Sequence, residues 1–148
     1  MRQASDCNHE EADTRLILHS LHARQSGSKN IMIRTVDTDV VVLATAYEKR
    51  LGAGATWIGF GTGKDFRYIP VHVIATKLSE NVCRVLPLFH ALSGCDTVSA
   101  FHGKGKKSAW SAWKKCPEFT AQLDCLMRNP LHLNDTDMKC IEAFITFM

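Results

Sequence analysis

Acidic side chains in three separate segments have the type and spacing that could bind metal ions. They are Glu11 and Asp13 near the start, Asp37 and Asp39 after a short β-prone segment, and Asp96 after an apolar helical pattern. Carboxylates brought into one pocket repel one another and lose hydration, so they are stable together only when a hard cation such as Mg²⁺ or Mn²⁺ neutralises them. Two such ions can activate a water molecule and stabilise the leaving oxygen of a phosphodiester. The pattern therefore predicts a Mg²⁺ or Mn²⁺ site.

Acidic residues at helix starts also have a purely structural explanation. Glu10, Glu11 and Asp13 favour the positive end of a helix dipole, and Asp37 or Asp39 is of a type that caps helix N-termini. Glu11 and Asp13 are two residues apart, so in a regular helix they face different directions and converge only at an irregular first turn. Spacing alone leaves both metal ligation and helix capping open.

A basic, glycine-rich segment could contact nucleic acid. It comprises Gly103, Lys104, Gly105, Lys106 and Lys107. Glycines at a helix start let the backbone approach a phosphate, whose charge is favoured by exposed N–H groups and by lysines. The alternative is a solvated helix face. The following Trp110 and Trp113 are expected to pack into the core rather than to stack on bases.

Two other chemistries are excluded by the details of the sequence. The stretch from Gly59 to Lys64 invites comparison with a phosphate-binding loop, but Ile58 stands at the first required glycine and Asp65 where Ser or Thr is needed. Cys95 is next to Asp96, but nothing gives it the ordered base partner that a catalytic thiol requires. We therefore predict neither an NTPase nor a cysteine-dependent enzyme.

The composition indicates one globular domain inside the cell. The chain has 148 residues, of which 45% are hydrophobic and 22% charged, which is enough apolar material for a core. No window approaches the roughly 20 uninterrupted apolar residues of a membrane span, and the polar start lacks a secretory apolar segment. We therefore expect an intracellular protein, nuclear or cytoplasmic, with no membrane partner. Its six cysteines are expected to be buried thiols, and without a CxxC pair they predict no zinc site.

The elements that must position these residues follow from the apolar periodicity. Helices are expected from Asn8 to about Gln25, Val40 to Arg50, His72 to Leu78, Val82 to Ser93 and Lys106 to Lys115, after Pro117, and from about Asp135, capped by Asn134 or Asp135. Ile31 to Val36 is expected to be a strand, and Ala55 to Phe60 and Phe66 to Val71 to form a hairpin around a glycine-rich turn. The predicted fold class is α/β, with a small, mostly parallel sheet flanked by helices and a C-terminal helical region.

Taken in order, these motifs resemble the flap-endonuclease branch of the PIN-like nuclease superfamily. The likeness lies in Glu11-Ala12-Asp13, Asp37-Thr38-Asp39, Gly94-Cys95-Asp96 and Gly103-Lys104-Gly105-Lys106-Lys107, which follow one another at similar separations over about two thirds of the chain. The resemblance implies a PIN-like domain over residues 1–148 with a C-terminal helical part over 97–148. It implies metal ligation by Glu11, Asp13, Asp37, Asp39 and Asp96, catalysis by the last three, and contact of the glycine-lysine turn with nucleic acid. The chain is also similar to a widespread group of animal proteins, frequently found in mobile-element-like settings, that share the wordings HEEADTR, DTDV and FHALSGCD.

Departures from the family pattern shape the functional expectation. Asp13 replaces the commoner Glu, and we expect the chain to lack the family's N-terminal strand with its metal-binding Asp. The apolar pattern from Ile141 to Met148 ends without a cap, so we expect a fragment of a longer element. The leading expectation is a metal-dependent nuclease domain that hydrolyses phosphodiester bonds of DNA or RNA. The alternative is a non-catalytic, degenerate or truncated nuclease-fold module that binds nucleic acid or a protein partner; a structural segment without independent function is a third possibility.

Overall fold

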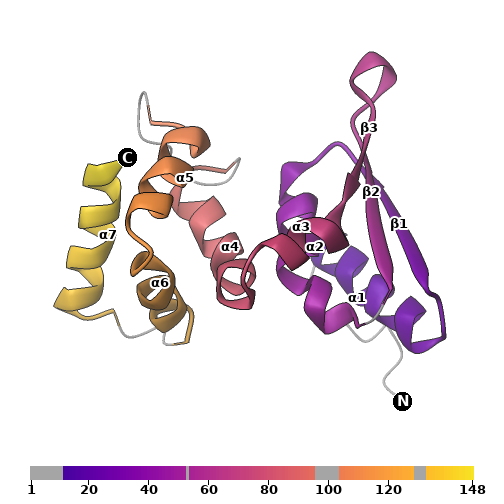
Figure 1. The fold of residues 1–148 in the computed structure, drawn as a ribbon, viewed down its shortest axis with the longest axis horizontal. Coiled ribbons are helices and arrows are strands. Elements are labelled where there is room, and N and C mark those ends of the chain that lie inside the picture. Colours follow the sequence, from indigo (N-terminus) through magenta and orange to yellow (C-terminus); the bar gives the residue numbers. More distant parts are fainter. Residues whose placement is uncertain (1–11, 53, 96–103, 129–132) are drawn as a thin grey trace. The chain divides into compact units, whose positions relative to one another are not determined.

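The described part of the chain forms two structural units. The computed structural model describes residues 12–52, 54–95, 104–128 and 133–148. They divide into two compact units, Met1–Cys83 and Arg84–Met148, and the division falls within one helix. Figure 1 shows the elements of both units.

The first unit contains a three-stranded mixed sheet in the order β1-β2-β3. Its elements are α1 (Ala12–Gln25), β1 (Asn30–Thr35), α2 (Thr38–Leu51), β2 (Ala55–Phe60), the 3₁₀ turn η2 (Gly63–Asp65), β3 (Arg67–Pro70) and α3 (Val71–Lys77). Strands β1 and β2 are parallel, with Ile33 opposite Ile58, and α2 is the crossover between them. Strands β2 and β3 form an antiparallel hairpin, with Ile58 opposite Ile69.

One face of this sheet holds the core of the first unit. Ile33 and Ile58 are buried with Ile17 of α1, Val40 of α2 and Val71 of α3. Helices α1, α2 and α3 lie on the same side of the strands (Figure 1). The core therefore lies between the sheet and these three helices, and the alternate residues of each strand point to the other face.

The second unit is helical. Helix α4 (Glu80–Leu92) continues into it, and α5 (Lys106–Lys115), α6 (Phe119–Arg128) and α7 (Asp135–Phe147) follow. Aromatic rings fill its centre, where Phe144 of α7 lies with its ring centroid 5.2 Å from Phe119 and 6.1 Å from Phe89. Trp113 is buried, and its ring lies 4.6 Å from that of Phe89. The predicted packing of this tryptophan into the core is confirmed.

The structure confirms the α/β class and most predicted elements, with some differences. The mostly parallel sheet is not confirmed, because the sheet has one parallel and one antiparallel pair of strands. The strand predicted to reach Val36 ends at Thr35, since the chain turns there and leaves Val36 67% exposed. The prediction of buried thiols is right for Cys83 and Cys140 but wrong for Cys125, which is exposed on α6.

Candidate functional site

Asp37 and Asp39 lie where β1 ends and α2 begins. The Asp37 N–H donates to the Thr35 hydroxyl oxygen at 3.0 Å, and Asp37 Oδ1 accepts the Asp39 N–H at 2.8 Å. Asp37 is thus the N-cap of α2, in an extended conformation (φ −94°, ψ 129°). Both aspartates are half-buried. The predicted capping role is confirmed for Asp37, and the two carboxylates are held beside the positive end of the helix.

The glycine-rich turn lies at the same edge of the sheet. Because β1 and β2 are parallel, their last residues, Thr35 and Phe60, are paired, and the Gly61 N–H donates to the Thr35 carbonyl at 3.1 Å. Gly61 has φ +87°, and a Cβ there would lie 2.7 Å from the Asp65 carbonyl oxygen, so the turn requires glycine. Ligands of open α/β sheets often bind outside the carboxyl ends of parallel strands, which is where this edge lies.

Of the other three predicted metal ligands, only Asp13 belongs to the described part of the chain. Asp13 lies in the first turn of α1 and is half-buried. Glu11 and Asp96 lie outside the described residues, as does Gly103 of the basic turn. Within the described part of the chain, no three His, Cys, Asp or Glu side chains are grouped closely enough to hold a metal ion. Asp37 and Asp39 have the oxygen donors that Mg²⁺ and Mn²⁺ prefer, but two carboxylates are fewer than the predicted set.

The basic turn leads into α5 as predicted. Gly105 is the N-cap and has no side-chain capping bond, so exposed backbone N–H groups begin the helix. Lys106 Nζ donates to the carbonyl oxygens of His90, at 3.5 Å, and Gly94, so this lysine stabilises the carbonyl end of α4. Lys104 and Lys107 are exposed. Among the described lysines of the turn, these two are the better placed for an external anion.

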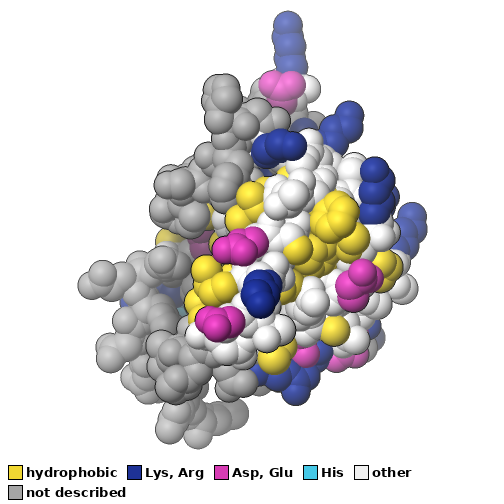
Figure 2. Space-filling model, turned by 90° about the vertical axis from the view of Figure 1, so that its left-hand side faces the viewer, with side chains coloured by type: hydrophobic (Ala, Val, Ile, Leu, Met, Phe, Trp, Pro, Cys, Tyr) yellow, Lys and Arg dark blue, Asp and Glu magenta, His cyan; other side chains and the backbone are white. Residues whose placement is uncertain are grey.

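A hollow beside α5 extends this basic surface. Its volume is about 400 Å³, and Lys107, Ser111 and Lys115 line it together with Phe147 of α7. The first three residues are four apart along α5, so they share one side of the helix. Figure 2 shows hydrophobic, basic and acidic side chains interspersed on the face of this unit that it views. The residues predicted to contact nucleic acid end at Lys107, and the structure adds Lys115 on the same side of α5.

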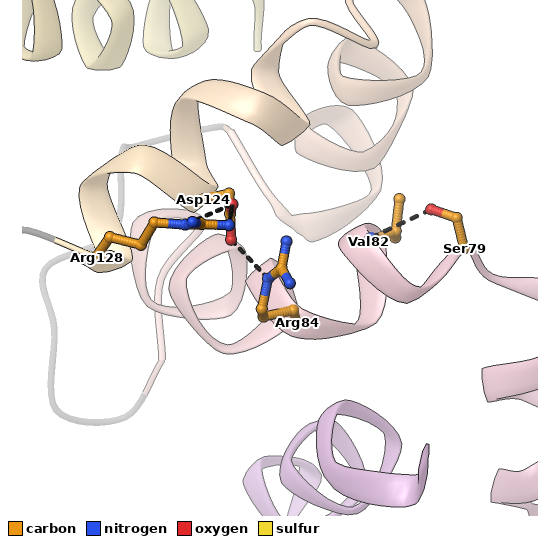
Figure 3. Close-up of polar contacts among 5 residues, drawn as sticks. All are labelled: Ser79, Val82, Arg84, Asp124 and Arg128. Carbon is orange, nitrogen blue, oxygen red and sulfur yellow. Dashed lines mark hydrogen bonds and ion pairs between the residues drawn. The ribbon is translucent and has the colours of Figure 1, made fainter. Parts of the chain in front are cut away.

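An ion-pair cluster joins α4 to α6 within the second unit (Figure 3). Arg84 Nε lies 2.6 Å from Asp124 Oδ1, and Arg128 Nη2 lies 2.8 Å from Asp124 Oδ2. Burial raises the pKa of Asp124, but the hydrogen bonds and charges of Arg128 and Arg84 together outweigh burial and hold that pKa below its ordinary value. Because both carboxylate oxygens are paired, we assign this cluster to the stability of the unit. Near the start of α4, Val82 N–H donates to Ser79 Oγ at 3.3 Å.

Comparison with known proteins does not assign the chain to a family. None of the protein-family models, curated proteins or solved structures matches it significantly. In the described segments, no helix combines the length and apolar character needed to cross a membrane. The function is therefore proposed from the residues themselves.

Proposed function

We propose that the protein is a metal-dependent nuclease-like domain that hydrolyses phosphodiester bonds of nucleic acid. The observation that carries the proposal is the pair of half-buried aspartates, Asp37 and Asp39, fixed at the carboxyl end of two parallel strands. The order of the acidic and glycine-lysine motifs, which resembles that of PIN-like nucleases, supports it. In this proposal Glu11, Asp13 and Asp96 complete the ligand set.

The proposed site uses the two oxygens of Asp37 differently. Oδ1 caps α2 through the Asp39 N–H, and Oδ2 is the oxygen available for a cation. A bound Mg²⁺ or Mn²⁺ would supply charge neutralisation at the phosphate and activation of the attacking water. The capping bond fixes the Asp37 carboxylate in one orientation, which lowers the cost of organising the site.

We also propose an intracellular location. Within the described part of the chain, Cys83, Cys116, Cys125 and Cys140 are free thiols. Free thiols are typical of proteins kept in a reducing compartment.

The experiment that tests the nuclease proposal is a cleavage assay with the full chain. Labelled DNA and RNA, each as single strand, hairpin and 5′ flap, are incubated with Mg²⁺, Mn²⁺ or EDTA. We expect cleavage with either metal and none in EDTA. The double variant Asp37→Asn with Asp39→Asn should lose at least about 100-fold in rate, because Asn can still cap α2 but ligates a hard cation poorly.

The matched control is Glu118→Gln, which also removes one carboxylate charge. Glu118 is exposed and belongs to the second unit, so its substitution should leave the cleavage rate unchanged. Absence of metal-dependent cleavage on every substrate would contradict the proposal. Cleavage that persists in the double variant would do the same, because it would come from another site or a contaminant.

A second candidate function is nucleic-acid binding without catalysis. It is favoured by the exposed Lys104 and Lys107 and by the continuation of the basic side of α5 to Lys115. Binding would then survive EDTA and weaken steeply with salt, since lysine–phosphate contacts release counterions. Lys107→Ala with Lys115→Ala should reduce the salt dependence by about one phosphate contact per lysine, whereas Lys139→Ala, at an exposed position of α7, should not.

A further inference from the structure

The second face of the sheet in the first unit has the composition of a stacking surface. In the β1-β2-β3 register, Met32 lies beside Trp57, and Gly59 of the middle strand lies between Arg34 of β1 and Tyr68 of β3. These residues alternate with the buried Ile33 and Ile58, so their side chains point away from the core. Met32 is 57% and Tyr68 62% exposed, and Trp57 and Phe66 are half-buried.

The aromatic rings on this face form two pairs in edge contact. Phe66 lies over Gly59, because a Cβ on that glycine would come within 3.2 Å of the Phe66 ring. The rings of Phe66 and Tyr68 are in edge contact, with centroids 5.0 Å apart and planes at 84°. Trp57 has a similar edge contact with His72, at 5.2 Å. Gly59 thus provides the space in which an aromatic ring covers the middle strand.

The charge of this region is positive. Arg34 Cζ lies 5.1 Å from the centroid of the Phe66 ring, which is a cation–π geometry. Lys64 is exposed in the turn of the same hairpin, where Asp65 is the single acidic residue. Arg67 alternates with Tyr68 and lies over the Phe60 ring, so it belongs to the other face of the sheet. None of the strands β1, β2 and β3 contains an acidic residue. A polyanion can therefore approach this face without meeting a carboxylate on the strands.

These features together specify the kind of partner. Exposed rings provide flat surfaces for unpaired bases, and stacking on them tolerates any base because every base has a π face. Arginine and lysine beside the rings suit the phosphates of the same strand. A duplex keeps its bases stacked inside and cannot use the rings in this way. An aliphatic peptide would use the rings but not the excess of cations.

We propose that this sheet face, defined by Met32, Arg34, Trp57, Phe66 and Tyr68, binds a short single strand of nucleic acid. Bases stack on Tyr68 and Trp57, and Arg34 and Lys64 contact phosphates. The interaction requires no metal and uses the first unit rather than the lysines of α5. It goes beyond the proposed function, since it holds whether or not the protein cleaves nucleic acid.

The test is fluorescence anisotropy of labelled ten-nucleotide single strands, of DNA and of RNA, with the full chain in EDTA. Tyr68→Ala should raise Kd by about 5- to 150-fold, the range expected for loss of one base-stacking partner. Arg34→Gln should lower the slope of log K against log salt by about 0.7, the value for one phosphate contact with a single strand. A duplex of the same sequence should bind more weakly than the single strand.

The matched control is a tyrosine–arginine pair on a helix. Arg50 Cζ lies 5.3 Å from the centroid of the Tyr47 ring on α2, and Tyr47 is 37% exposed. Tyr47→Ala should leave Kd unchanged. Because Tyr68 and Arg34 are exposed, both variants should keep the circular dichroism spectrum of the native chain, which is measured alongside.

The remaining outcomes of the binding and cleavage assays distinguish single-strand binding by the sheet face from the proposed nuclease function. Wild-type affinity in both Tyr68→Ala and Arg34→Gln, or no single-strand binding at all, overturns it. Binding that depends on Lys107 and Lys115 alone overturns it and leaves the α5 surface as the nucleic-acid site. Tyr68-dependent binding of a labelled acidic peptide, with no binding of either strand, would assign the face to a protein partner instead. Tyr68-dependent binding without metal-dependent cleavage would support this proposal while removing the nuclease.

Discussion

Substitution of Asp37 separates its structural role from its proposed chemical role. Asp37 Oδ1 accepts the Asp39 N–H at 2.8 Å and is the side-chain cap of the fourteen-residue helix α2, which carries the buried Val40 and Ala44. Loss of such a cap costs about 1 kcal/mol, within a range of roughly 0.5–2. Asn caps helices about as well as Asp, so Asp37→Asn should keep most of this contribution, whereas Asp37→Ala should lose it.

The expected magnitude can be measured by thermal unfolding followed by circular dichroism. For a unit of the size of Met1–Cys83, a loss of about 1 kcal/mol lowers Tm by roughly 4–8 °C. Asp37→Ala should show this decrease, and Asp37→Asn should stay within about 2 °C of the wild type. Titration with Mn²⁺ in a calorimeter should show weakened binding in both variants, because both remove the carboxylate.

Two results would refute this reasoning. Equal destabilisation of Asp37→Asn and Asp37→Ala would show that the charge, not the capping bond, stabilises α2. Wild-type Mn²⁺ affinity in Asp37→Asn would show that the carboxylate is a cap and not a ligand.

Three further predictions concern the stability of each unit. The folded-state pKa of Asp124 is lowered, so its ionised form stabilises the fold at pH values above the unfolded pKa of about 3.9. The difference in Tm between wild type and Asp124→Asn should therefore be present at pH 7 and shrink as pH falls below about 4. Phe144→Ala should lower the free energy of unfolding in urea by about 3–5 kcal/mol, since the Phe144 ring is buried against Phe89 and Phe119. Phe147→Ala, at a 61% exposed position, should lower it by less than about 0.5 kcal/mol. Gly63→Ala should cost about 1–2 kcal/mol from its positive φ alone. Gly61→Ala should destabilise the first unit more, because at Gly61 an added Cβ also meets a backbone carbonyl. Equal effects of the two variants in thermal unfolding would contradict this.

Local patterns in the sequence predicted most helices and the hairpin. Asn134 was a candidate cap, and in the structure its side chain and that of Asp137 form a complete capping box at the start of α7. Helix α2 begins two residues before the predicted Val40, because the cap at Asp37 rather than the apolar run fixes its start. The antiparallel hairpin was predicted from its glycine-rich turn, whose conformation is set by local residues.

Contacts between distant residues could not be predicted in the same way. Lys106 was assigned to nucleic acid, but its partners are carbonyl groups at the end of α4, twelve and sixteen residues earlier in the chain. The sheet face of Met32, Arg34 and Tyr68 depends on a register that pairs three separate strands, which no single segment reveals. Of the predicted metal ligands, Asp37 and Asp39 are joined by a local turn. The approach of Asp13, Glu11 and Asp96 to them depends on tertiary packing and stays a prediction.

The most direct test of the central claim is a crystal structure of the full chain soaked in MnCl₂, with anomalous diffraction used to locate the metal. We expect an anomalous peak about 2.1–2.3 Å from carboxylate oxygens of Asp37 or Asp39, with at least one further ligand from Glu11, Asp13 or Asp96. No peak at this edge of the sheet, with the five carboxylates facing solvent separately, would contradict the claim that they form a metal site.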